Sequence, residues 1–97
     1  MSKREEIRRT NAASKRIIRS FMRDTIEMIV KALVDDVEAV DVRAIEREGT
    51  TRIEVRVAQT DMGKVIGKQG RTVRALRSLV YAAGLKQRRR YVLDVVE

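Results

Sequence analysis

The residues best suited to chemistry form one short run, Gly67-Lys68-Gln69-Gly70, in which two glycines enclose two polar residues. Because neither glycine has a side chain, a phosphodiester backbone can approach the main chain closely. The run also precedes a helical pattern whose first N–H groups and positive dipole end favour an anion. Basic side chains flank it at Lys64, Arg71 and Arg74. The pattern predicts a site that grips the backbone of a nucleic acid.

Two apolar residues, Val65 and Ile66, precede this run and would form an apolar wall beside it. Bases packed on such a wall, with their backbone held by the loop, correspond to a single strand of RNA. The only aromatic residues are Phe21, Tyr81 and Tyr91, too few for a base-stacking platform. Duplex DNA is a less favoured partner, because the helix after the loop would have to enter a DNA groove, and one short helix of a monomer makes few contacts there.

The alternative is that the two glycines have only a structural role, as the turn of a helix–turn–helix joint. The Ile before the first glycine and the cations on both sides favour contact with RNA. Two nucleotide motifs fail on spacing. A P-loop needs four residues between its first Gly and its Gly-Lys pair, and a Ser or Thr after the Lys. Here only three residues separate Gly63 from Gly67, and Gln69 follows Lys68. A Rossmann fingerprint needs a G-x-G-x-x-G run, which the chain lacks.

The composition disfavours an enzyme. The chain has no His and no Cys, so the commonest general base, the commonest metal ligand and any thiolate site are missing. The acidic pair Asp35-Asp36 falls where a helical pattern stops and is typical of a solvated helix end. We therefore expect no catalytic residue, no metal and no cofactor. The alternative is a hydrolase or nuclease whose active site matches no known motif. Such an enzyme would show turnover that depends on a divalent metal.

The charge of +8 is concentrated in two segments. Residues 1–23 carry +6 and residues 63–97 carry +7, whereas the stretch between them carries −5. Such a distribution favours a polyanionic partner, either nucleic acid or an anionic membrane surface, with solubility alone as the plainer explanation. No apolar run approaches the about 20 residues that span a bilayer, and residues 1–16 lack the apolar core of a signal peptide. We expect a cytoplasmic protein without membrane insertion.

Hydrophobic periodicity predicts the element order α-β-β-α-α-β. A first helix begins near Phe21, with Asp24 as a candidate cap, and its apolar face comprises Met22, Ile26, Ile29, Val30 and Leu33. Alternating residues predict strands over 39–45 and 52–57, joined by a turn at 48–50. Asp61 is a candidate cap of a short helix that Gly67 ends.

The second half of the chain continues with a helix over 71–83 that Gly84 closes, a polar loop over 86–90 and a strand over 91–96. The residues expected to face inward from this helix are Val73, Leu76, Leu79 and Val80. Apolar residues on both sides of the last strand indicate either an interior strand or an edge covered by a partner. The fold class is α+β, with helices packed on one face of a three-stranded sheet.

The run from Asp61 to Thr72, DMGKVIGKQGRT, is similar to the signature of the small stand-alone bacterial KH-domain proteins, the KhpA family. The segment Ile29–Asp35 also resembles that family's first helix, and the resemblance covers about residues 24–96. It implies a type II KH domain over residues 22–97. It also implies that the Gly67–Gly70 loop clamps RNA at one side of a binding groove. A variable loop over 86–90 would face the same groove, and the alternative is that its charges only form a solvated turn. The residues expected to contact RNA are Lys64, Val65, Ile66, Gly67, Lys68, Gln69, Gly70, Arg71, Arg74, Lys86, Arg88, Arg89 and Arg90.

The resemblance further implies an RNA chaperone or post-transcriptional regulator that forms homodimers and pairs with a second, larger KH-containing protein. The alternative function is an interaction scaffold, in which the fold mainly dimerises or docks on a protein partner.

The N-terminal segment departs from the family, whose members begin near Met22. Residues 1–21 would be a basic extension, helical or disordered, or the product of an upstream start that is not native. As an arm it would attract phosphate without regard to sequence. A membrane-surface helix is disfavoured, because the apolar side is thin. The cations of this arm are Lys3, Arg4, Arg8, Arg9, Lys15, Arg16 and Arg19.

Overall fold

The computed structural model describes residues 2–97, with the side chains of residues 9–12, and hence that of Arg9, outside the description. The helices and strands confirm the predicted order α-β-β-α-α-β. They are α1 (Lys3–Leu33), β1 (Asp41–Arg47), β2 (Thr50–Arg56), α2 (Met62–Ile66), α3 (Arg71–Lys86) and β3 (Arg90–Val95). Single 3-10 turns stand before β1, before α2 and between α2 and α3.

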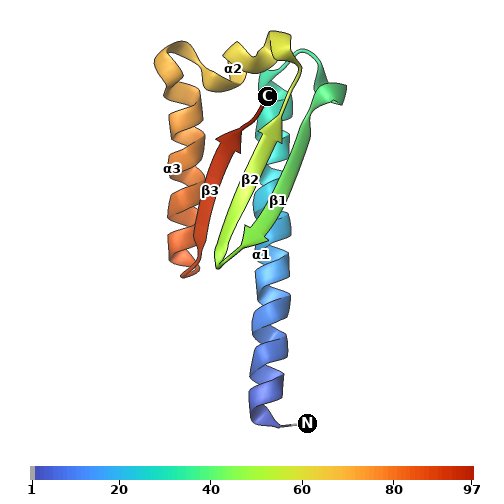
Figure 1. Ribbon diagram of the computed structural model, residues 1–97, viewed down its shortest axis with the longest axis vertical. Coiled ribbons are helices and arrows are strands. Elements are labelled where there is room, and N and C mark those ends of the chain that lie inside the picture. Colours follow the sequence, from blue (N-terminus) through green and yellow to red (C-terminus); the bar gives the residue numbers. More distant parts are fainter. Residues whose placement is uncertain (1) are drawn as a thin grey trace.

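The three strands form one mixed sheet in the order β1-β2-β3. The β1–β2 pair is antiparallel and the β2–β3 pair is parallel. Helices α1 and α3 cover one face of this sheet (Figure 1). The residues that fill the space between helices and sheet include Ile26, Val30, Val42, Ile53, Val55, Val80 and Leu93. The opposite face is charged, and Arg52 lies there between Glu54 and Asp94. The domain is thus the expected two-layer α+β fold.

Helix α1 begins eighteen residues before the expected start at Phe21 and runs without a break to Leu33. Ser2 is its N-cap, and the Ser2 hydroxyl accepts a hydrogen bond from the Glu5 N–H at 3.2 Å. The first part of α1 therefore projects beyond the sheet (Figure 1). No helix of residues 2–97 combines the length and apolarity needed to cross a membrane. A domain boundary at residue 22 stays a prediction, since α1 crosses it.

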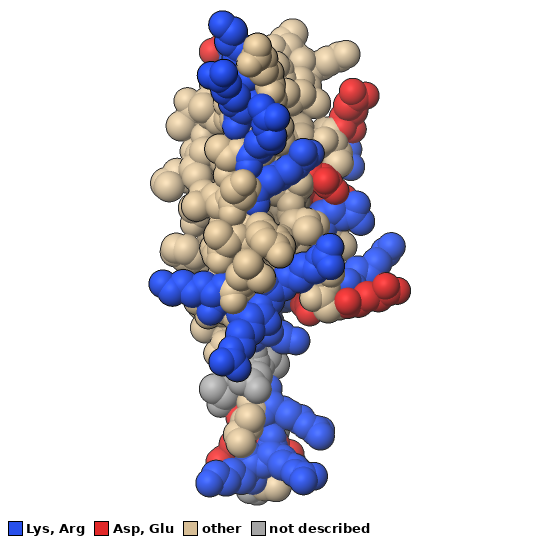
Figure 2. Space-filling model, turned by 90° about the vertical axis from the view of Figure 1, so that its left-hand side faces the viewer, with Lys and Arg blue, Asp and Glu red and all other residues tan. Residues whose placement is uncertain are grey.

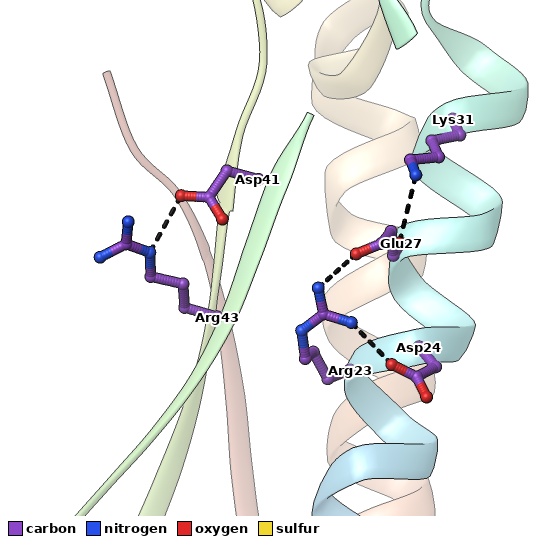
Figure 3. Close-up of polar contacts among 6 residues, drawn as sticks. All are labelled: Arg23, Asp24, Glu27, Lys31, Asp41 and Arg43. Carbon is purple, nitrogen blue, oxygen red and sulfur yellow. Dashed lines mark hydrogen bonds and ion pairs between the residues drawn. The ribbon is translucent and has the colours of Figure 1, made fainter. Parts of the chain in front are cut away.

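Asp24 lies inside α1, so its expected role as a helix cap is wrong. Its carboxylate lies 2.6 Å from the Arg23 guanidinium, which also binds Glu27, while Lys31 reaches Glu27 from one turn further on (Figure 3). Arg43 makes a similar pair with its own strand neighbour Asp41 on β1. The i,i+4 pairs of α1 stabilise the helix on its exposed side and leave its apolar side to the core.

One expectation about burial is wrong. Leu79 is 50% exposed, because residues 73, 76 and 80 already occupy the side of α3 that meets the sheet. Of the two alternatives for the last strand the structure has the edge, since β3 has only β2 as its neighbour in the sheet. Part of that edge is covered by its own chain, because Arg77 of α3 donates a hydrogen bond from Nε to the Leu93 carbonyl at 3.2 Å.

Gly84 lies inside α3 and does not close it, because the helix continues to Lys86. A β-carbon at Gly84 would lie 2.7 Å from Tyr91 Cδ2 and 2.8 Å from the Arg89 carbonyl oxygen. The Arg89 N–H in turn donates to the Gly84 carbonyl at 2.8 Å. The absence of a side chain at residue 84 therefore lets the chain turn back closely over α3 and begin β3.

Replacing Gly84 with Ala is expected to destabilise the protein by about 1–3 kcal/mol, because the added methyl group collides with Tyr91 and with backbone. The matched control is Gly63→Ala in α2, where a β-carbon meets nothing within 4 Å. That substitution is expected to leave stability unchanged or raise it by up to about 1 kcal/mol. Urea unfolding of the three proteins measures both effects, and equal effects would refute the close approach at Gly84.

Candidate nucleic-acid interface

The loop between α2 and α3 depends on a glycine at its first position. Helix α2 ends at Ile66, and Gly67 takes φ 78° and ψ 169°, a conformation that disfavours any other residue. A β-carbon at Gly67 would lie 2.2 Å from the Thr72 hydroxyl oxygen and 2.8 Å from the Thr72 nitrogen. The two helices therefore meet at a joint too tight for a side chain.

The second half of the loop is left-handed. Gln69 has φ 57° and ψ 27°, and Gly70 has φ 73° and ψ 15°. For a residue with a side chain this conformation costs roughly 1–2 kcal/mol. Arg74 helps to hold it, because its Nη2 donates to the Gln69 carbonyl at 2.8 Å, and Arg71 reaches the Gln69 side chain at 3.5 Å. A β-carbon at Gly70 would meet nothing within 4 Å, so the backbone here faces open space.

The electrostatics of the loop favour an anion. Helix α3 is 16 residues long and starts at Arg71 without a side-chain cap, so its positive dipole end is open to a ligand. Lys68 is exposed, and its ammonium makes no ion pair within residues 2–97. Arg71 and Arg74 are exposed, and each has further N–H donors beyond its contact with Gln69. Figure 2 shows Lys and Arg side chains running along this face, with acidic side chains mostly at its margin.

The structure divides the residues expected before the loop. Val65 is fully buried in the core, so it cannot line a groove as predicted. Ile66 is 37% exposed and is the part of the expected apolar wall that a ligand can reach. The Lys64 ammonium binds the carboxylates of Asp35 and Asp61, so it braces the fold instead of standing open beside the loop. The hydrogen bond to Asp35 raises the pKa of Lys64 and keeps it charged.

Asp61 stands at the N-cap position of α2 as predicted, but its side chain makes no capping hydrogen bond and reaches back to the end of α1. Its buried carboxylate accepts hydrogen bonds from the N–H of Asp35 at 3.2 Å and from that of Asp36 at 2.9 Å. The hydrogen bond from Asp36 is the main cause that lowers the pKa of Asp61, against the opposing effect of burial. The carboxylate thus ties the start of α2, and with it the loop, to the chain that leaves α1.

A shallow groove lies further along α3, and its lining residues were not predicted from the sequence. It has a volume of about 410 Å³ and lies between α3 and the edge strand β3. Ser78 and Tyr81 line it on one side and Val92 and Leu93 on the other. Tyr81 follows Arg74 by seven residues, or two turns, so helical spacing alone could have placed both on one side of α3.

The loop over Lys86–Arg90 lies at the other end of α3 from the glycine loop (Figure 1). A helix of 16 residues spans about 24 Å, so the two basic segments do not form one patch. Arg88 is left-handed with φ 57°, and Arg90 begins β3. None of residues 86–90 lines the groove between α3 and β3, and the expected contact of this loop with RNA stays a prediction.

Replacing Asp61 with Asn is expected to destabilise the protein near neutral pH, and much less in acid below the lowered pKa of this carboxyl group in the folded protein. The pKa of Asp61 is lower in the folded state than the ordinary 3.8, so its charge stabilises the fold above that value. This stabilisation is lost as the pH falls through the lower, folded pKa. Urea unfolding of both proteins across this range measures the difference, with exposed Asp24→Asn as control. A difference that is constant with pH would show that the charge is unimportant.

Comparisons with known proteins place the chain among its relatives. Residues 23–95 match the family model described as KhpA/KhpB, KH domain. The chain is 50% identical over 76 residues to RNA-binding protein KhpA of Halalkalibacterium halodurans, which covers 78% of this chain and 100% of the relative. It is 47% identical over 78 residues to RNA-binding protein KhpA of Aquifex aeolicus, covering 80% and 99%. No solved structure matches the chain significantly.

The matched region includes the whole sheet, α2, the glycine loop, α3 and the second part of α1. The projecting part of α1 lies outside it, since the match begins at residue 23. The match covers most of the chain, as the resemblance of the glycine loop and its surroundings predicts. The chain belongs to the KhpA/KhpB family of KH-domain proteins.

Proposed function

We propose that this protein binds single-stranded RNA at the Gly67–Gly70 loop and is not an enzyme. The observation that carries the proposal is the bare backbone at Gly70, which faces open space at the positive end of α3 with Lys68, Arg71 and Arg74 around it. The relatives are named RNA-binding proteins, which supports RNA as the polyanion.

In this proposal the loop holds the backbone and the groove holds the bases. Phosphate oxygens lie near the positive end of α3 and accept hydrogen bonds from the side chains of Lys68, Arg71 and Arg74. Bases lie against Ile66 and continue over Tyr81 and Val92 of the groove between α3 and β3. These contacts are mostly to backbone or to apolar surface, so little sequence preference is expected.

Low sequence preference is what an RNA chaperone or a general post-transcriptional regulator requires, and we propose that role for this chain. A cytoplasmic location, where its RNA targets would lie, belongs to the same proposal.

The decisive test is RNA binding by a Lys68→Asp, Gln69→Asp double variant. Asp tolerates the left-handed conformation of residue 69, and both glycines stay in place, so the fold should be kept. Negative charge then stands where phosphate is expected, and affinity for single-stranded RNA should fall by at least about tenfold. Titrations at about 50 and 200 mM salt should also show the strong salt dependence of phosphate contacts in the intact protein.

The matched control is Ser2→Asp with Arg43→Asp, which changes the net charge equally. Asp preserves the N-cap of α1, and Arg43 lies exposed on β1. This variant should bind RNA nearly as well as the intact protein. If both variants lose affinity equally, RNA responds only to net charge. If the loop variant is folded and binds normally, the loop is not the RNA site.

We also propose that the protein forms a homodimer, so that the same domain serves as an interaction scaffold. A small apolar groove of about 120 Å³ lies between α1 and α3 on the side away from the sheet. Phe21 and Leu79 line it and are 68% and 50% exposed. Such residues, side by side on two helices, are typical of a surface that another copy covers. A second, larger KH-containing partner stays a prediction, and it would compete for this surface.

Leu79→Glu is expected to convert the dimer to a monomer, because a carboxylate would be buried without a partner. The control is Leu85→Glu, which lies on the same helix, is similarly exposed at 55%, and does not line the groove. Sedimentation equilibrium measures the mass of each. Dimerisation that survives Leu79→Glu, or a monomeric intact protein, would refute the proposed surface.

A further inference from the structure

A second basic pocket lies at the end of the sheet opposite the glycine loop. It has a volume of about 370 Å³ and is enclosed by three segments that are far apart in the sequence. The projecting part of α1 contributes Lys15 and Arg19, and the chain between α3 and β3 contributes Arg88, Arg89 and Arg90. The end of the β1–β2 hairpin completes the wall, with residues 46, 49 and 51.

The charges in this pocket are unbalanced. Five cations line it against one carboxylate, that of Glu46. That carboxylate is already bound by Arg19, which fixes α1 to the end of β1. Since the other four cations have no carboxylate in the pocket, their mutual repulsion would be relieved by an anion.

One polar atom in the pocket lining has no partner. Arg89 Nε is buried and makes no hydrogen bond in the described part of the chain. Its backbone is fixed, because the Arg89 N–H binds the Gly84 carbonyl within the close approach described above. Buried N–H groups are nearly always paired in proteins, so an anion that draws the Arg89 side chain toward the open pocket would supply the acceptor that this donor lacks. Tyr91 also lines the pocket, and burial raises the pKa of its hydroxyl, which stays protonated.

We infer that this pocket is a phosphate site for the RNA strand that the glycine loop binds, so that the strand runs along α3 and is held at both ends. Phosphate would supply a hydrogen-bond acceptor to Arg89, and its negative charge would balance the positive charges of Lys15, Arg88 and Arg90. Figure 2 shows Lys and Arg side chains both at the upper end of this face and lower down, where the projecting helix leaves the domain. The inference rests on the proposed function and adds a second site to it.

The site depends on the N-terminal part of α1, which the family match does not include. Without Lys15 and Arg19 the wall formed by α1 would be missing, and the remaining arginines would belong to an open surface loop. The extension is therefore more than a diffuse basic arm. Its continuous helix carries two of its cations to a defined place beside the folded domain.

The test uses the intact chain, with Lys15→Gln and Arg88→Asn together as the variant. Gln is a good helix former, and Asn tolerates the left-handed conformation of residue 88, so the fold should be kept. The control is Arg8→Gln with Arg16→Gln, which removes two exposed charges of the same helix outside the pocket. The probes are unstructured RNAs of about four nucleotides, which fill a KH loop, and of about twelve, which extend beyond it.

The pocket variant should bind the twelve-nucleotide RNA about tenfold more weakly than the intact protein. Its plot of log affinity against log salt should be shallower by about 0.7, the value for one lost phosphate contact to a single strand. The control should change both quantities much less, and the four-nucleotide RNA should not distinguish the variants. In the intact protein, inorganic phosphate should shift the amide NMR signals of Gly49 and Arg88–Arg90.

Equal losses in the pocket and control variants would overturn the site and leave only a diffuse basic arm. So would unchanged binding of the long RNA combined with loss of binding to phosphatidylglycerol vesicles, which would assign the pocket to a membrane surface. Neither outcome touches the proposed function, because that stands or falls with the Lys68, Gln69 variant. The two failures are therefore distinguishable.

Discussion

The contact between Gly67 and the first turn of α3 is the constraint on which the functional surface depends. With a side chain at residue 67, Thr72 would have to move, and α3 would leave α2 in another direction. The present direction lays α3 beside β3, so Arg77 can reach the Leu93 carbonyl and a groove forms between helix and edge strand. The same joint points the positive end of α3 at the open backbone of Gly70. One steric requirement thus sets the loop, the groove and their electrostatic character.

A tight joint is useful only if α2 is itself held in place, and a short helix of five residues has little packing of its own. Val65 anchors it in the core, and Asp61 anchors it to the N–H groups that follow α1. A buried carboxylate requires compensation, and Lys64 supplies part of it. The domain therefore uses one of the cations near the loop to stabilise the loop's support, and Lys68, Arg71 and Arg74 remain as the cations of the proposed RNA site.

Local patterns predicted the order of elements and the glycine loop well. Alternation over residues 52–57 and the spacing of Val73, Leu76 and Val80 are determined by burial against a neighbouring layer, which leaves a periodic trace in the sequence. The errors concern residues whose role depends on structure outside the local pattern. Asp24 suits a helix cap by type, but α1 begins at Lys3, so Asp24 lies inside the helix and pairs with Arg23. Asp61 stands at the N-cap position of α2, but its carboxylate accepts from N–H groups 25 and 26 residues back. Gly84 likewise looks like a helix end, and only the three-dimensional return of Arg89 and Tyr91 explains it.

The two ends of α3 impose opposite requirements on an RNA strand that follows it. At the loop, the helix dipole and the cations act together on a phosphate. At the far end the dipole is negative, so Lys86 and the following arginines partly serve to neutralise the last carbonyls of the helix. Those arginines alone would hold phosphate less well than an equal number at the loop. Lys15 and Arg19 belong to α1, so their charges are not needed to neutralise the carbonyl end of α3. The extension of α1 therefore supplies positive charge that is available to a phosphate at this end of the domain.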